Sequence, residues 1–202
     1  MEYKIEKLLE ELQNKGVLKT QDILKLGISK ENLRKLHANG KVERIARGFY
    51  VLPEYEFSEM QSIVEVSKQV PKGVICLLSA LRIHDFTTQN PFQIWLALER
   101  RAWKPQIEGT TKVRYMRFSG EAFASGVQVK NIDNIEVKVY CPAKTVADCF
   151  KYRNKVGLDV ALEALREGWK SKLFTMDELW KYAKICRVEN VMRPYLESMV
   201  SL

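Results

Sequence analysis

The fold is decided by residues 17–53, VLKTQDILKLGISKENLRKLHANGKVERIARGFYVLP. We expect a short helix here that begins at Thr20, whose hydroxyl can cap its N-terminus. The helix ends before Gly27, where a left-handed C-terminal cap favours glycine. Its apolar positions are Ile23, Leu24 and Leu26.

A second helix is predicted from Lys30 to Asn39, with Ser29 as its N-cap. We expect this helix to bury Leu33, Leu36 and His37. Its other face carries Lys30, Glu31, Arg34, Lys35 and Ala38, of which residues 30, 34 and 38 form one row. The helix therefore presents cations on the side that faces away from its core.

Two short strands follow, the first with Val42 and Ile45 and the second over residues 49–52, where Pro53 stops it. Two helices, a tight turn between them and a basic hairpin are the order of a winged helix-turn-helix. Its second helix would enter a major groove. Arg44 and Arg47 on the hairpin would reach phosphates or the minor groove. From Lys25 to Leu52 seven Lys and Arg face two Glu, a local charge of +5. A small helical module that binds protein is the alternative.

Composition limits the class of protein. The chain has 202 residues, long enough for one or two domains, and its net charge of +8 favours an anionic partner such as nucleic acid. No apolar run approaches the roughly 20 residues that span a bilayer. The N-terminal MEYKIEKLLEEL is a charged amphipathic helix and not a signal peptide.

The cysteines indicate a reducing compartment. The chain has four cysteines, which are scattered among apolar residues and form no C-x-x-C pair. This pattern is typical of buried free thiols in a cytoplasmic protein. His37 and His84 are the only histidines, and neither lies at ligand spacing from a cysteine. We therefore expect no metal and no cofactor.

The chain as a whole predicts an α+β protein of two domains. Residues 1–54 would form the winged helix-turn-helix, with a helix over residues 3–14 packed beneath it, and residues 58–202 a mixed domain with a central sheet flanked by helices. A capping box at Ser58 and Gln61 would start the second domain. Strands are predicted at 93–98, 112–118 and in a hairpin over 127–140. Residues 74–86 fit a strand or a buried helix, and their spacing favours the helix. Helices follow from Pro142, with a capping box at Thr175 and Glu178.

A second basic segment runs from Arg100 to Arg117, with six basic residues and one acid. Trp103 and Tyr115 are interleaved with these cations, a combination that can hold a phosphate backbone and stack on bases. In the strand over 112–118 we expect the odd positions, such as Val113 and Tyr115, to face the core. The alternative for the segment is an ordinary solvated strand face.

The chain resembles a known family. The string VYCPAKTVADCFKYRNKVGLDVALEALREG from Val139, the SALRIH segment from Ser79 and the RIARGFYVLP that closes the first domain are similar to the AbiEi family. These proteins are the antitoxins of type IV toxin–antitoxin (abortive infection) systems. The resemblance implies a repressor that binds inverted repeats of double-stranded DNA in its own promoter, as a monomer or weak dimer. It also implies an antitoxin that opposes a nucleotidyltransferase-like toxin, with direct contact left open.

The resemblance also implies site residues. Base contacts would come from Ser29, Lys30, Asn32, Arg34 and Lys35, and backbone contacts from Lys41, Arg44 and Arg47. The face that carries the antitoxin function would comprise Lys144, Asp148, Lys151, Tyr152, Arg153 and Asn154. Two plainer readings stay open: residues 144, 148 and 151 as a salt-bridged solvent face, and Tyr152 and Arg153 as side chains that lock the helix against the sheet.

The sequence does not predict an enzyme. It contains no G-x-S-x-G, Walker-type loop or H-E-x-x-H motif. Glu136 and Lys138 share a strand face near Asp133, a spacing that some metal-dependent nucleases use. An exposed strand edge explains the same spacing, and we expect no catalytic residues.

Overall fold

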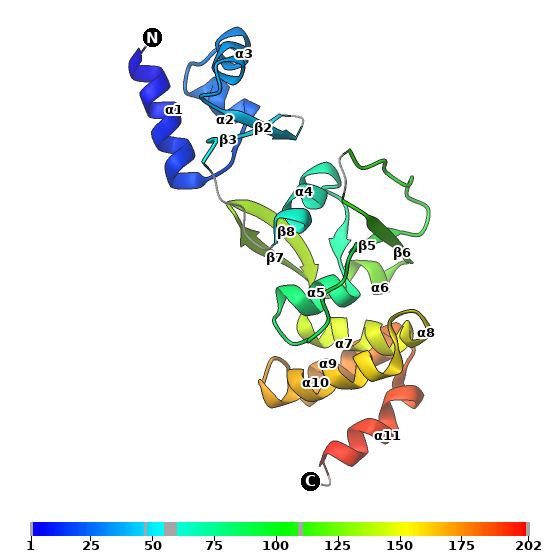
Figure 1. The fold of residues 1–202 in the computed structure, drawn as a ribbon. Helices are drawn as coiled ribbons and strands as arrows, with labels where there is room; N and C mark the ends of the chain where they lie inside the picture. Colours follow the sequence, from blue (N-terminus) through cyan, green and yellow to red (C-terminus); the bar gives the residue numbers. More distant parts are fainter. Residues whose placement is uncertain (1, 47, 55–59, 109–110, 201–202) are drawn as a thin grey trace. The chain divides into compact units, whose positions relative to one another are not determined.

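The structure, a computed structural model, describes residues 2–46, 48–54, 60–108 and 111–200. It is α+β, as predicted, with helices and mixed sheets (Figure 1). It divides into two compact units, Met1–Glu65 with Asn131–Glu136, and Val66–Lys130 with Val137–Leu202. The boundary predicted at residues 54–58 falls largely outside the described residues.

The first unit begins with three helices and a small sheet. Its elements are α1 (Glu2–Lys15), β1 (Leu18–Lys19), α2 (Thr20–Lys25), α3 (Lys30–Ala38), β2 (Glu43–Ala46) and β3 (Phe49–Val51). The strands form an antiparallel sheet in the order β1-β3-β2, in which Tyr50 lies opposite both Leu18 and Arg44. The two-residue strand β1 was not predicted, because it is too short to show an alternating pattern.

One apolar core joins these elements. Its buried members are Leu8, Leu12, Leu18, Ile23, Ile28, Leu33, Leu36, Val42 and Tyr50. The predicted packing of the helix over residues 3–14 is confirmed by its buried Leu8 and Leu12, and the predicted burial of Leu33 and Leu36 on α3 is confirmed too. Burying such side chains contributes roughly 1.5–3 kcal/mol each, so this core fixes which face of α3 points outward.

Three details of the first unit test the sequence reasoning. Gly27 follows α2 with a φ of +81°, the left-handed conformation that was predicted. Thr20 is the first residue of α2 and not its cap, because Lys19 occupies the cap position in extended geometry. His37 is exposed and not buried: it lies one position beyond the Leu36 stripe, and its Nδ1 lies 3.1 Å from the carbonyl oxygen of Val42.

The rest of the described chain contains helices around one larger sheet. Its elements are α4 (Gln61–Gln69), β4 (Val74–Ile75), α5 (Leu77–Ile83), β5 (Ile94–Glu99), β6 (Val113–Phe118), α6 (Glu121–Ala124), β7 (Val127–Ile132), β8 (Ile135–Tyr140), α7 (Pro142–Lys151), α8 (Arg153–Val156), α9 (Leu158–Lys170), α10 (Met176–Cys186) and α11 (Glu189–Val200). The five strands lie in the order β6-β5-β4-β8-β7. The sheet is mixed, since β4 is antiparallel to β5 and parallel to β8.

Helix α7 is the centre of this region. Every residue from Ala143 to Phe150 is buried. Helices α5, α9, α10 and α11 contact it, and Figure 1 shows α7, α9, α10 and α11 stacked on one side of the sheet. Pro142 occupies its first turn, where a missing N–H costs nothing, as predicted.

Other predictions were confirmed or corrected. The hairpin is confirmed, with Asp133 and Asn134 at positive φ in its turn, and so is the capping box of Thr175 and Glu178. Residues 74–86 contain both a short strand and a helix. In β6 the even positions Met116 and Phe118 are buried, so the predicted inward face was wrong. The proposed cap Ser58 lies outside the described residues.

Two further expectations concern the whole chain. The four cysteines are free thiols, three of them buried, as predicted. Among the described residues, no helix combines the length and the apolar character needed to cross a membrane.

Candidate nucleic-acid interface

Helix α3 begins with a defined cap. Ser29 adopts extended geometry, and its hydroxyl oxygen accepts a hydrogen bond from the backbone N–H of Asn32 at 3.2 Å. This bond satisfies one of the N–H groups that a helix start leaves unpaired. The predicted cap is confirmed, and it fixes the direction in which the first turn of α3 points.

The outward face of α3 is basic. Lys30, Arg34 and Lys35 are exposed, and Asn32 is half-buried. Lys35 pairs with Glu31 at 2.9 Å across one turn, but both side chains are mostly exposed, so water screens this ion pair. We call Lys30, Asn32, Arg34 and Lys35 the α3 surface.

The remaining predicted DNA contacts follow α3 in the chain. Lys41 lies exposed in the turn that follows the helix, and Arg44 lies exposed on β2, opposite Tyr50 of β3. Arg47 lies outside the described residues. The described predicted contacts thus lie on α3, at its N-cap, in the turn that follows it and on β2.

Two residues of the functional face predicted in the C-terminal region are buried, in contrast to the exposed cations of α3. Lys144 and Asp148 are fully buried, and their Nζ and Oδ2 atoms lie 2.5 Å apart. The Lys144 ammonium lies 4.2 Å from the ring centre of Tyr140 and 4.9 Å from that of Phe118. Cys186 of α10 donates its S–H to the other Asp148 oxygen at 3.2 Å.

The ion pair predicted between these residues is confirmed, but both surface readings of it were wrong. Residues 144 and 148 lie neither on an accessible face nor on a solvated one, because other elements cover α7 from Ala143 to Phe150. Burial raises the pKa of Asp148, and the Lys144 ammonium opposes that rise. The pair links α7 to two strands and to α10.

Residues 151–154, the last four of the predicted functional face, are closer to solvent. Lys151, Tyr152 and Arg153 are half-buried and Asn154 is exposed. The Tyr152 hydroxyl donates to the carbonyl oxygen of Arg117 on β6 at 3.1 Å, and Arg153 donates to that of Phe150 at 3.0 Å. The reading that Tyr152 locks the helix against the sheet is confirmed.

A comparison with known protein families finds a match within the first unit. Residues 6–53 match the family model described as transcriptional regulator, AbiEi antitoxin. This segment is therefore similar to AbiEi-type regulators. The match runs from α1 to just beyond β3, so it contains the α3 surface, Lys41 and Arg44. No curated protein matches the chain. The resemblance stated from the sequence is confirmed for residues 6–53, and the C-terminal block lies outside the matched residues.

Sequence reasoning overlooked two polar side chains of this AbiEi-like segment. Lys19 is exposed on β1, next to Phe49 of β3, and His37 is exposed on the last turn of α3. His37 lies three residues after Arg34, a spacing that could have placed it beside the α3 surface. Lys19 gave no signal, since β1 itself was not predicted.

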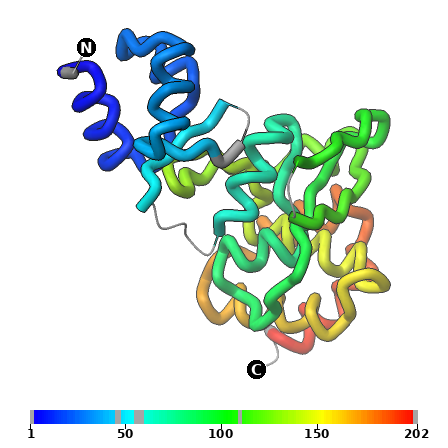
Figure 2. Tube along the Cα trace, turned by 45° about the horizontal axis from the view of Figure 1, so that its top comes forward, coloured from blue at the N-terminus to red at the C-terminus, as the bar shows by residue number. Residues whose placement is uncertain are grey.

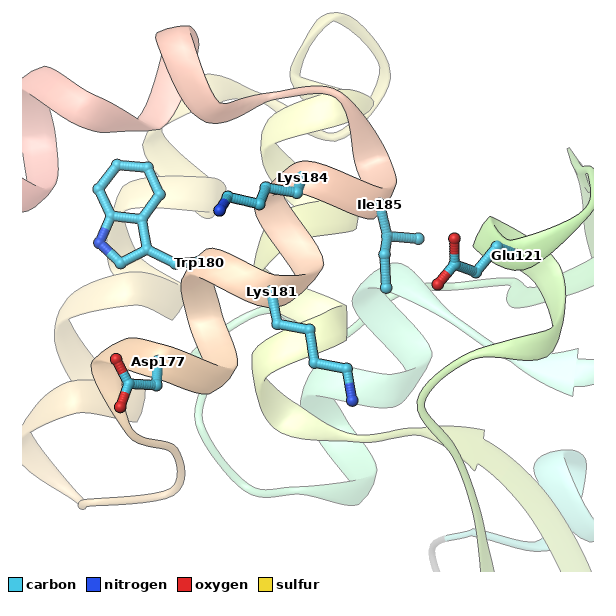
Figure 3. A pocket seen from close by; sticks show the side chains of 6 residues that line it. All are labelled: Glu121, Asp177, Trp180, Lys181, Lys184 and Ile185. Atoms are coloured by element: carbon cyan, nitrogen blue, oxygen red, sulfur yellow. The ribbon is translucent and has the colours of Figure 1, made fainter.

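The C-terminal region contains an open hollow of about 480 Å³. It is lined by Glu121, Asp177, Trp180, Lys181, Lys184 and Ile185. Figure 3 shows Glu121 reaching from α6 toward Ile185, with the other lining side chains along α10. Two acids and two lysines leave this hollow without a dominant charge. Within the described residues, no cluster of three or more His, Cys, Asp or Glu side chains could hold a metal ion.

Proposed function

We propose that this protein is a winged helix-turn-helix repressor that binds inverted repeats in its own promoter and an antitoxin of a type IV system. The observation that carries the DNA-binding part is the α3 surface. A helix anchored by Leu33 and Leu36 presents Lys30, Arg34 and Lys35 to solvent.

The residue types support duplex DNA as the partner. Arginine can donate two hydrogen bonds to a guanine in the major groove, and asparagine can pair with adenine. Lys41 and Arg44 would bind phosphates beside the groove, and strands β2 and β3 would form the wing. The α3 surface has no large apolar side chain, which a protein-binding helix would use as its anchor.

A gel-shift experiment with the upstream DNA of the gene tests this proposal. We would compare the wild type with the double variant Arg34→Ala, Arg44→Ala in the presence of non-specific competitor. The expected result is specific binding by the wild type and a loss of at least about fivefold in the variant, because the base contact proposed for Arg34 contributes roughly 1–3 kcal/mol. Loss of the phosphate contact proposed for Arg44 adds to this decrease in affinity.

A matched control removes two exposed cations elsewhere. Arg166→Ala with Lys170→Ala lowers the charge of α9 by the same amount, and we expect it to leave operator binding within about threefold of the wild type. If both double variants lost operator affinity equally, the binding would depend on the net charge of the protein and not on the α3 surface. No specific shift by the wild type would favour the alternative, a winged-helix module that binds protein.

The antitoxin part of the proposal is that the same chain counteracts a nucleotidyltransferase-like toxin without catalysis of its own, whether or not the two proteins contact each other directly. We expect the Arg34→Ala, Arg44→Ala variant, expressed from an unrelated promoter, to restore growth in cells that produce the toxin. Such a result separates this role from repression. Loss of rescue in a stable, folded variant would show that DNA binding is the whole function.

A further inference from the structure

Residues 100–108, the described part of the loop after β5, are held in place although they contain no helix or strand. In Figures 1 and 2 they belong to the green segment that follows β5. Arg117 of β6 donates to the carbonyl oxygens of Glu99 and Ala102 at 3.0 and 2.7 Å. The Tyr115 hydroxyl donates to the Pro105 carbonyl at 2.8 Å.

A second anchor fixes the far end of the described loop. Gln69 of α4 donates its amide N–H to the carbonyl of Glu108 at 3.0 Å, and its amide oxygen accepts from the Glu108 N–H at 2.7 Å. Such a two-way bond holds the backbone of the loop as a neighbouring strand would. The segment from Arg100 to Glu108 is therefore a fixed support.

This support carries an indole outward. Trp103 is 89% exposed, the most exposed large apolar side chain among the described residues. Arg100, Arg101 and Lys104 beside it are exposed too. Two other cations of the basic segment have roles of their own. Arg117 anchors the loop together with Tyr115, and the Arg114 guanidinium lies 4.3 Å from the centre of the Trp95 ring. The Lys104 ammonium lies 5.4 Å from the centre of the Tyr115 ring.

We propose that Trp103 with Arg100, Arg101 and Lys104 forms a binding site for single-stranded nucleic acid, separate from the α3 surface. An unpaired base would stack on the indole of Trp103. The flanking cations would hold the phosphates on either side of that base.

The exposed indole selects this ligand over two others that cations also attract. Bases in a duplex are already stacked on each other, so an indole beside the helix gains nothing from them. An acidic peptide pairs with the cations but offers no planar ring to Trp103. A single strand offers both partners, and every base has a face that can stack.

The test is fluorescence anisotropy of the full chain with labelled single-stranded RNA and single-stranded DNA of about 12 nucleotides. Measurements at about 50 and 200 mM salt separate stacking from charge. We expect Trp103→Ala to weaken binding about tenfold at both salts and Trp103→Phe to restore most of the affinity. Arg100→Ala with Arg101→Ala should reduce the salt dependence by about 1.4 in log–log slope. The RNA and DNA arms show which sugar the site prefers.

Tyr3→Ala is the matched control, since it removes another exposed aromatic ring, 74% exposed, from the first unit. We expect it to leave single-strand binding unchanged, and Trp103→Ala to leave operator binding unchanged. The proposal is overturned if Trp103→Ala and Tyr3→Ala behave alike, if phenylalanine gives no rescue, or if polyglutamate competes as well as the oligonucleotides do. Failure of operator binding would leave this result untouched, because the two sites use different residues.

Discussion

Lys144 and Asp148 place two ionisable groups where the surrounding helices and strands exclude water. Removing ions from water costs several kcal/mol each, and their mutual attraction offsets that cost only when both partners are present. Tyr140, Phe118 and Cys186 complete the contacts of the pair. At the scale of single residues, this pair is the most sensitive point of the C-terminal region.

We expect Lys144→Met to lower the free energy of unfolding by about 3–5 kcal/mol, because it leaves the Asp148 carboxyl buried without its cation. The double variant Lys144→Met, Asp148→Leu should recover most of that loss, since it removes both buried charges. Urea unfolding measures both values.

An exposed pair provides the control for these variants. Lys25 and Asp22 lie 2.9 Å apart at the surface, and Lys25→Met should cost no more than about 1 kcal/mol. Equal costs at the two pairs, or a double variant as unstable as Lys144→Met, would contradict the account of the buried pair.

His84 makes stability depend on pH. Burial lowers its pKa from 6.5 to about 4, against the effect of its 2.7 Å hydrogen bond to the Tyr140 carbonyl, and nearby Lys130 adds to the decrease. Between pH 6.5 and 4, His84 therefore binds a proton in the unfolded chain but not in the folded chain. The free energy of unfolding decreases as the pH is lowered through this window.

His84→Gln keeps an N–H donor for Tyr140 but cannot be protonated. We expect the wild type to lose about 1–2 kcal/mol more than this variant between pH 7 and 4.5, a value reduced for partial exposure of the ring. Unfolding curves at both pH values measure the difference. If the wild type and His84→Gln lose the same free energy of unfolding between the two pH values, the pKa of His84 does not differ between the folded and the unfolded chain.

At the scale of secondary-structure elements, the cap of α3 has a structural effect and a functional one. Ser29→Ala removes the hydrogen bond to the Asn32 N–H and should destabilise the first unit by about 1 kcal/mol. Ser29→Asp keeps a capping oxygen, so stability should be retained. It adds a negative charge beside the α3 surface, so operator affinity should fall.

Thermal unfolding and gel shifts on the two Ser29 variants separate these effects. The Ser29→Asp variant would bind DNA like the wild type only if the N-terminus of α3 lies away from the phosphates. That outcome would remove Ser29 and Lys30 from the interface while leaving the cap intact.

Elements with a local chemical signal could be predicted from the sequence. Gly27, Pro142 and the Thr175–Glu178 capping box mark helix ends through their own backbone geometry and hydrogen bonds, and all three were located correctly. Strand β1 has no such signal. It exists because its two residues pair with β3.

The errors in the C-terminal region have a physical reason in tertiary packing. On α7 the spacing of Lys144, Asp148 and Lys151 is that of a solvated face, and only the covering helices show that two of these residues are internal. In β6 both faces carry apolar side chains, so the sequence did not decide that Met116 and Phe118 point inward. The exposed position of Trp103 likewise depends on contacts from Arg117 and Gln69.

At the scale of the whole molecule, the chain combines an N-terminal unit, of which residues 6–53 are matched by the AbiEi regulator model, with a larger unit built around α7. The proposed roles use different residues: the α3 surface for duplex DNA and Trp103 with its neighbours for single strands. Variants at one surface should therefore leave the other unaffected.

The central claim is that α3 reads base sequence, and Arg34 tests it most directly. The measurement is the ratio of affinities for the operator and for a scrambled duplex, in the wild type, Arg34→Ala and Lys25→Ala. We predict that Arg34→Ala lowers this ratio about tenfold, because a lost base contact affects only the specific complex, and that Lys25→Ala leaves it unchanged. An Arg34→Ala protein that loses affinity equally for both duplexes, with the ratio preserved, would contradict the account.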